Sequence, residues 1–247
     1  MLDHRQSVKE VTRHLLFRLR IDGVLDILRR WKGRDTDHLK KRKLSDVFSD
    51  IYAKDIWVEY SDQVTRSGVG STDAATREVS ASLSKFLNDI SCRKLVDIGC
   101  GDFNWMRRVA ADIDYVGIDV VPSIIAKNNS KYGDARHLFI CSDATSELIP
   151  TGDVAVCREV IFHLSFHDAR RLLLNIAQSG FKYVVLTTDE SVWFNSDIRS
   201  GDYRKMNLEI SPFRLPPPLL RMMDDKVNIG RSLSVWPASS IRSAMGA

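Results

Sequence analysis

The chain has 247 residues, with 36 Lys and Arg against 32 Asp and Glu and a formal net charge of +4. This size suits one α/β domain with appendages. No apolar run approaches the ~18 residues of a membrane-spanning helix, and the N-terminus lacks the continuous apolar core of a signal peptide. The four cysteines form no C-x-x-C pair. We therefore expect a cytoplasmic protein whose cysteines are reduced.

The positive charge is concentrated at the N-terminus. Residues 1–45 hold 13 Lys and Arg against 6 Asp and Glu, whereas the remaining chain is net negative by three. We favour a helical cap that packs on the main domain or on a second subunit. In the second case the protein would be a homo-oligomer. The alternative is a basic amphipathic helix that lies on an anionic membrane surface. The charge is not accompanied by a nucleic-acid-binding motif, so we expect no nucleic-acid partner. Apolar residues recur here at helical spacing, at Val8, Val11, Leu15, Leu16 and Leu19 and again from Ile21 to Trp31.

An aromatic stretch follows at 48–57, and a glycine-containing loop lies at 67–71. We expect this part to fold over a ligand site, with Trp57 or Tyr60 lining that site. Ser71 or Thr72 is positioned to cap a helix that leads into the first strand. We therefore divide the chain into an N-terminal helical cap and lid segment, 1–71, and a main domain, 72–247.

The stretch from Leu95 to Trp105 predicts a strand, a tight turn and a helix. A short apolar run ends near Asp97, and Gly99 and Gly101 follow. Glycines at such a turn let the backbone approach a ligand, because no Cβ intrudes. In open α/β sheets, ligands bind at the carboxyl ends of the strands, where Asp97 is expected to lie.

Two further predicted strands also end in acids. Tyr115 to Val120 contains Asp119, about 20 residues past the glycines, which is the spacing of a carboxylate that accepts ribose hydroxyls. Pro122 then opens a helix at a position where its missing N–H costs nothing. The strand that begins at His137 leads to Asp143 and Ala144. Three strand-terminal acids in succession are more specific than any one of them.

The second half of the chain continues the alternation of strands and helices. The range 153–157 predicts a fourth strand, 166–178 an amphipathic helix and 183–189 a fifth strand, while 231–236 predicts an antiparallel edge strand. The expected fold is therefore a Rossmann-like, doubly wound and mostly parallel sheet.

An irregular, polar and proline-rich insertion is expected near 190–225. Long loops without repeats in compact domains tend to be functional, so we interpret this insertion as a substrate-binding lid. Its candidate substrate ligands are Asn195, Asp197, Arg204 and Asn207.

Residues 95–189 resemble the cofactor half of a class I S-adenosylmethionine-dependent methyltransferase. The motif Asp97-x-Gly99-x-Gly101 carries the resemblance, although Phe103 replaces the usual third glycine. The resemblance implies that the glycines approach the methionine part of the cofactor and that Asp97 supports the turn and the amino group. It further places Asp119 at the ribose and Asp143 at the adenine. The other residues that we assign to the cofactor are Val120, Ala144 and Arg158.

A dinucleotide-dependent dehydrogenase is the competing interpretation of the glycine turn. It is disfavoured because Asn104 stands where the third glycine of G-x-G-x-x-G belongs. A second resemblance, carried by 158–165, Thr187-Thr188 and 195–208, is to bacterial methyltransferases that modify surface polysaccharides or glycans. It implies an O-methyltransferase that acts on a hydroxylated small molecule or sugar. N- or C-methylation of a metabolite and a non-catalytic cofactor-binding module are the alternatives.

Hydroxyls are weak nucleophiles, so their methylation calls for a general base. His163 follows the fourth strand and has a suitable pKa, and Glu159 is the substitute base. No spacing of side chains typical of a metal site is present, so we predict no metal.

Overall fold

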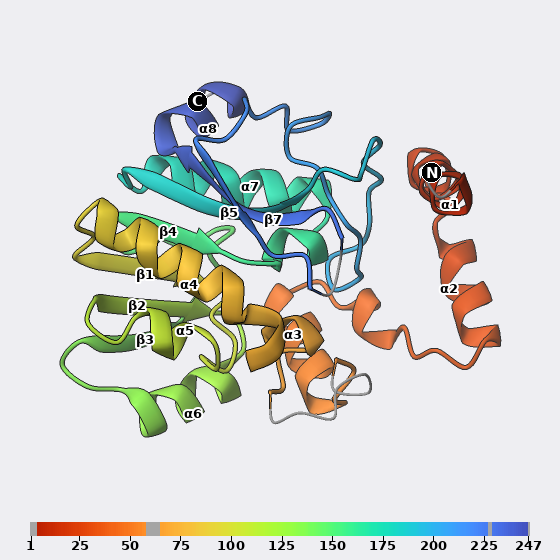
Figure 1. The fold of residues 1–247 in the computed structure, drawn as a ribbon. Coiled ribbons are helices and arrows are strands. Elements are labelled where there is room, and N and C mark those ends of the chain that lie inside the picture. Colours follow the sequence, from red (N-terminus) through yellow and green to blue (C-terminus); the bar gives the residue numbers. More distant parts are fainter. Residues whose placement is uncertain (1–3, 58–64, 227–228, 247) are drawn as a thin grey trace.

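The computed structural model describes residues 4–57, 65–226 and 229–246 (Figure 1). Seven strands form one sheet in the order β3-β2-β1-β4-β5-β7-β6. The five strands from β3 to β5 are parallel, while β7 runs antiparallel to both of its neighbours. The predicted Rossmann-like sheet is confirmed. The strands are β1 (Lys94–Ile98), β2 (Asp114–Asp119), β3 (His137–Cys141), β4 (Val154–Cys157), β5 (Tyr183–Asp189), β6 (Leu220–Met223) and β7 (Arg231–Pro237).

Helices cover both faces of the sheet. Alternate residues of a strand face opposite sides, so Leu95 of β1 packs with α4 and α5, whereas Val96 packs with α7 and α8. Helix α6 contributes Ile125 to the α4 side. The two cores thus lie on either side of a sheet that is buried on both faces, as parallel sheets usually are. These helices are α4 (Asp73–Asp89), α5 (Met106–Val109), α6 (Pro122–Tyr132), α7 (Phe166–Gln178) and α8 (Ala238–Met245).

Local sequence explains where the main helices begin. The hydroxyl of Thr72 accepts a hydrogen bond from the Ala75 N–H and caps α4, which confirms one of the two predicted caps. Ser165 caps α7 in the same way through the Asp168 N–H. Helix α6 starts at Pro122 as predicted.

The C-terminal strands correct one prediction. The segment predicted as an edge strand is β7, which lies inside the sheet between β5 and β6. The edge strand at this end of the sheet is β6, which is only four residues long and mostly exposed. This strand is very short and begins just one residue after three prolines. Its alternation of apolar and polar residues is therefore too brief to predict a strand from the sequence.

The N-terminal part holds α1 (His4–Arg18), α2 (Gly23–Trp31) and α3 (Leu44–Ala53), with short 3-10 turns η1 (Asp37–Lys40) and η2 (Val69–Ser71). Figure 1 shows α1 and α2 standing off from the sheet, while α3 lies beside its carboxyl edge near α6. None of the described helices is long and apolar enough to cross a bilayer.

Candidate functional site

A cleft of about 1040 Å³ opens at the carboxyl edge of the parallel strands. It is lined by residues that follow β1, β2, β3 and β4 and by the N-terminal segment. The structure brings together here every residue that the sequence assigned to the cofactor and to catalysis: Asp97, Gly99, Gly101, Asp119, Val120, Asp143, Ala144, Arg158, Glu159 and His163.

The glycine loop after β1 has no room for side chains. Gly99 and Gly101 both have positive φ, 73° and 52°. A Cβ at Gly99 would collide with the side chain of Val160, and one at Gly101 would collide with the hydroxyl of Ser67. The loop therefore exposes bare backbone to the cleft. Phe103, which replaces the third glycine of the motif, also has positive φ, 58°, and packs on Tyr115.

Asp97 is buried beneath this loop. Its carboxylate accepts a hydrogen bond from the Tyr115 hydroxyl at 2.8 Å. Burial, opposed by that hydrogen bond, raises the pKa of Asp97 to about 7. A cationic ligand group beside Asp97 would favour its charged form and bind most tightly to it.

Asp119 and Asp143 continue the row of carboxylates. Asp119 accepts the N–H groups of Gly101 and Val121 at 3.1 and 3.0 Å, which fixes its orientation at the end of β2. Burial nevertheless raises its pKa above the ordinary value. One oxygen of Asp143 accepts the N–H and hydroxyl of Thr145, and this residue also lines the cleft. The row offers acceptors to a ligand rich in N–H and O–H donors.

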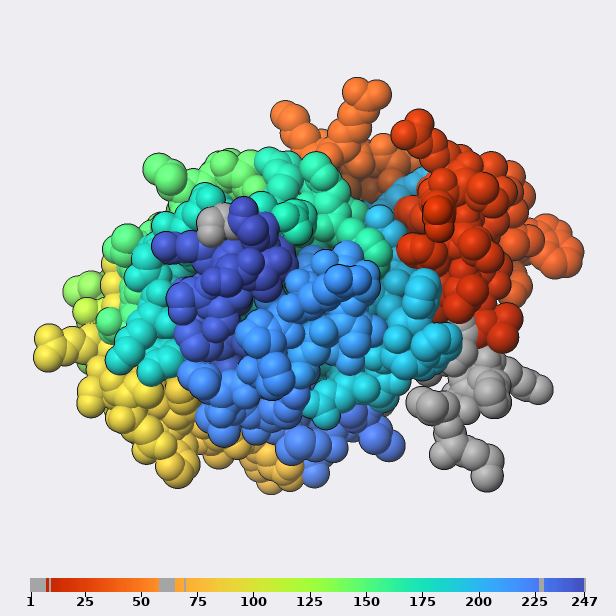
Figure 2. All heavy atoms as spheres, turned by 90° about the horizontal axis from the view of Figure 1, so that it is seen from above, coloured from red at the N-terminus to blue at the C-terminus, as the bar shows by residue number. Residues whose placement is uncertain are grey.

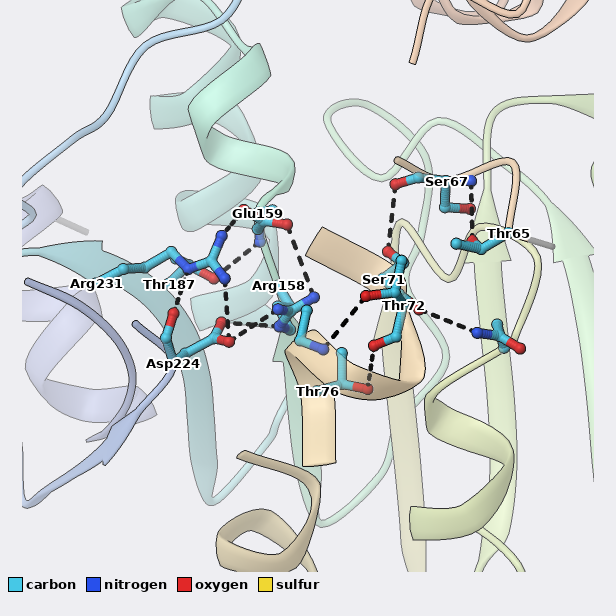
Figure 3. A network of polar contacts seen from close by, with 12 residues as sticks. Thr65, Ser67, Ser71, Thr72, Thr76, Arg158, Glu159, Thr187, Asp224 and Arg231 are labelled. Atoms are coloured by element: carbon cyan, nitrogen blue, oxygen red, sulfur yellow. Dashed lines mark hydrogen bonds and ion pairs between the residues drawn. The ribbon is translucent and has the colours of Figure 1, made fainter. Parts of the chain in front are cut away.

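Arg158 and Glu159 belong to a buried ionic network that sequence reasoning missed (Figure 3). Arg158 donates to both oxygens of Asp224 at 2.9 Å, and Arg231 donates to Asp224 and to Glu159. Burial works to raise the pKa of Glu159, but the two guanidinium groups outweigh it and hold that pKa below its ordinary value. Glu159 is thus a fixed carboxylate at the cleft wall, and its ion pairs make it a weak proton acceptor.

His163 lies in the 3-10 turn η3 (Val160–His163) that follows β4. Its Nδ1 is 3.0 Å from the carbonyl oxygen of Asp202. A carbonyl only accepts, so Nδ1 carries the proton and Nε2 is the free acceptor. Burial lowers the pKa of His163 even though Glu159 acts in the opposite direction, so the ring is neutral at pH 7. The rings of Trp57 and Tyr203 flank it at 5.0 and 5.3 Å between centroids.

The four candidate substrate ligands do not line the cleft. Each is engaged with backbone instead. Asn195 exchanges hydrogen bonds with the backbone of Asn207 and also donates to Ser211, and Asp197 accepts from the Phe166 and Ile198 N–H groups. Arg204 donates to four carbonyl oxygens, three of them in or next to η3. These bonds hold the insertion against the turn that carries His163, so we do not propose the four as ligands. The insertion reaches the cleft only through Gly201, Asp202 and Tyr203.

The N-terminal segment forms the outer wall of the cleft. Trp57 lines it, as expected, whereas Tyr60 lies outside the described residues. The contribution of the residues around η1 to the cleft was not predicted, because the charged residues there are typical of a solvated linker. His38 is 6% exposed, lines the cleft and has an Nδ1 without a hydrogen-bond partner in the described structure. The signal available in the sequence was the pair His38-Leu39, which interrupts a run of charged residues and which the structure buries.

A short strap ties this segment to the glycine loop. Ser67 accepts the Asp102 N–H at 3.1 Å and lies 3.0 Å from the Tyr52 hydroxyl. Asp102 in turn accepts from the Thr65 hydroxyl and the Arg66 N–H. The strap thus lies against the glycine loop, and its role as a lid stays a prediction.

Comparison with known proteins adds a family match. Residues 96–179 match the model of a methyltransferase domain. In structure, the chain is similar to magnesium protoporphyrin IX methyltransferase (ChlM) from Synechocystis PCC 6803 with bound SAM, with a TM-score of 0.56, 15% identity, and coverage of 79% of this chain and 97% of that chain. It is also similar to the N-methyltransferase NodS from Bradyrhizobium japonicum WM9, with a TM-score of 0.52, 14% identity, and coverage of 67% and 98%. No curated protein matches the chain in sequence.

The matched segment contains the glycine loop and the three strand-end acids. The sheet order agrees with this match, so residues 96–179 are assigned to a methyltransferase domain that uses S-adenosylmethionine. The residues present fit the cofactor, since bare glycine backbone and a row of carboxylates face one cleft. When bound there, S-adenosylmethionine supplies an electrophilic methyl group.

Proposed function

We propose that this enzyme methylates a hydroxyl of a small molecule or of a glycan, with His163 as the general base. The observation that carries the proposal is the state of His163: it is neutral, its Nδ1–H is held by the Asp202 carbonyl, and Nε2 is left as the acceptor. In the proposed step the hydroxyl oxygen forms its bond to the methyl carbon as the carbon–sulfur bond breaks. The hydroxyl proton passes to Nε2.

The location of His163 supports this role. Val160, in the same 3-10 turn, packs against Gly99, so the turn lies directly beside the glycine loop. On its other side, His163 faces the part of the cleft formed by the N-terminal segment, where Trp57, Tyr203 and His38 combine aromatic surface with polar atoms. Such a lining suits a hydroxylated ring. The acceptor is thereby held in line with the donor, which is the main contribution of the protein to the rate.

The experiment is methyl transfer from isotope-labelled S-adenosylmethionine to cell-envelope glycan fractions, free sugars and a matched set of amines. We expect methoxy products, distinguished from N-methyl products by the chemical shift of the labelled methyl group. His163→Ala should lower kcat by about 100-fold or more, in the range that general bases contribute, while the cofactor Kd stays within about twofold. Unchanged turnover in His163→Ala, or labelling of amines alone, would overturn the proposal.

A further inference from the structure

Much of the apolar surface of helices α1 and α2 faces solvent, although Val11, Leu16, Phe17 and Leu25 are half-buried. In α2, the positions 24, 27, 28 and 31 form one helical stripe, and all four are exposed, Ile27 at 68% and Trp31 at 86%. No residue of α2 is buried. Leu15 and Leu19 continue the exposed apolar surface at the end of α1, and Ile21 connects the two helices. We call this surface, formed by Leu15, Leu19, Ile21, Val24, Ile27, Leu28 and Trp31, the outer apolar face.

The opposite stripe is polar and faces the protein. Asp22 and Asp26 both pair with Arg199, and Arg29 pairs with Asp202 at 2.6 Å. In α1, Glu10 bonds Ser196, and Arg13 reaches the Tyr203 carbonyl oxygen. Figure 2 shows α1, in red, lying against the cyan segment to which these partners belong. Charged and polar contacts therefore hold much of the inner side of the helices to the body, whereas the apolar stripe of α2 faces away from it.

Several cations close in sequence to the outer apolar face are unpaired, whereas the acids that follow α2 are paired: Asp37 with Arg30 and Lys40, and Asp35 with Lys54. Within the described part of the chain, Arg18, Arg20, Lys32 and Arg34 are exposed, and none of them has an ion-pair partner. The three acids described in α1, α2 and their connection, Glu10, Asp22 and Asp26, are all engaged on the inner side. The helix pair thus presents apolar side chains and free positive charge together.

We propose that the outer apolar face docks on the surface of an anionic lipid bilayer. Apolar and aromatic residues flanked by Lys and Arg are what an interfacial helix needs, because the apolar face enters the headgroup boundary while the cations bind anionic headgroups. The charge decides the occupant: four unpaired cations around the patch would repel the same four on a second copy of this chain, whereas they complement an anionic surface.

The docked helix pair would lie beside the mouth of the cleft. Arg29, Gly33 and Arg34, at the end of α2 and just after it, line the cleft themselves. Docking would therefore hold the cleft next to the lipid surface and shorten the search for an acceptor carried there. The docking itself does not depend on the identity of that acceptor, so it is testable even if the proposed hydroxyl chemistry is wrong.

The test is flotation of the full chain with vesicles of phosphatidylcholine alone and of phosphatidylcholine mixed with phosphatidylglycerol. We expect binding to the anionic vesicles only, and weakening of that binding as salt is raised. The double variant Ile27→Glu with Trp31→Ala should reduce the vesicle-bound fraction by about tenfold or more. The matched control is Leu148→Glu, since Leu148 is even more exposed, at 94%, but lies outside the helix pair.

Each variant is also checked by circular dichroism and by cofactor binding, so that loss of docking is separated from loss of fold. Sedimentation of the parent chain tests the alternative that a second copy of the chain covers the outer apolar face. The proposal is overturned if the parent chain ignores anionic vesicles, or if Leu148→Glu weakens docking as much as the double variant does. It is equally overturned if the outer apolar face is instead buried in a dimer that Ile27→Glu with Trp31→Ala dissociates.

Discussion

The carboxylate of Asp224 accepts two hydrogen bonds from Arg158, each at 2.9 Å, across 66 positions of sequence. Arg231 donates to the same carboxylate at 3.2 Å and also holds Glu159. Both guanidinium groups are almost completely buried, and Arg158 additionally lies over the Trp105 ring. Asp224 and Glu159 therefore together neutralise the two cations behind the cleft wall, and Asp224 is the fully buried one of the two acids.

The substitution Asp224→Asn should destabilise the protein by about 3 kcal/mol or more, because removing one partner leaves buried positive charge uncompensated. Urea unfolding followed by circular dichroism measures the change. Asp225→Asn is the matched control, since the neighbouring Asp225 makes no hydrogen bond in the described structure, and it should stay within about 0.5 kcal/mol of the parent. Similar losses for both substitutions would mean that the network contributes nothing specific.

The row of strand-end acids at the cleft was predictable from the sequence, whereas this network was not. Asp97, Asp119 and Asp143 each follow an apolar run that forms a strand, so their common edge follows from the parallel topology alone. Asp224 follows a strand of four residues, and its pairing with Arg158 depends on how β7 and β6 return to the sheet. No local pattern encodes that return.

In the insertion, by contrast, the sequence suggested substrate ligands where the structure engages the same residues with backbone groups. Asn195 and Arg204 are polar residues in a long loop, and this composition is equally typical of ligand binding. The structure uses them for backbone groups that no regular element satisfies, such as the carbonyl oxygens of Ile161 and Leu164. Whether such a residue binds a ligand or satisfies backbone groups depends on its burial, which the sequence does not show. The side chain of Arg204 is only 1% exposed.

The pH dependence of kcat should have an acidic limb that belongs to His163. Burial lowers the pKa of His163, so protonation removes the base only below about pH 6.5, and the rate should be flat between about pH 7 and 8. The measurement is kcat at saturating cofactor and acceptor from about pH 5 to pH 8, which covers the acidic limb and the flat part. In His163→Ala the acidic limb should disappear along with most of the rate. An unchanged limb in that variant would assign the titration to another group.

Gly101 should be essential for the cofactor for a steric reason. Gly101→Ala places a Cβ against Ser67, where the strap crosses the loop, and calorimetry should show cofactor affinity reduced by about tenfold or more. Gly180→Ala is the control, since Gly180 also has positive φ, 82°, but nothing lies within 4 Å of an added Cβ. Both substitutions impose roughly 1–2 kcal/mol of backbone strain, but only the first should affect binding. Equal affinities would show that the contact between the loop and Ser67 does not shape the cofactor site.

Asp97 should link cofactor binding to proton release. The pKa of Asp97 is about 7 in the free enzyme because the group is buried, whereas the ammonium of the cofactor, placed beside it, would favour the carboxylate. Affinity should therefore fall as the pH drops below 7, by up to about tenfold per unit. Asp97→Asn should bind more weakly at pH 7.5 and lose this dependence between about pH 5.5 and 7. Calorimetry in buffers of different ionisation enthalpy measures the released proton directly.

The same raised pKa predicts that Asp97 destabilises the free enzyme. Below about pH 4 the carboxyl is protonated in the folded and unfolded chains alike, so it costs nothing there. As the pH rises, the unfolded chain loses the proton first, and the penalty on the folded state grows until the pH passes about 7. At pH 8, Asp97→Asn should therefore raise the free energy of unfolding of the cofactor-free protein, by up to about 4 kcal/mol. The variant should gain stability as it loses affinity, which urea unfolding at pH 5 and pH 8 would show. A variant that is less stable than the parent at pH 8 would mean that Asp97 is held as a carboxylate by the fold itself and not by the cofactor.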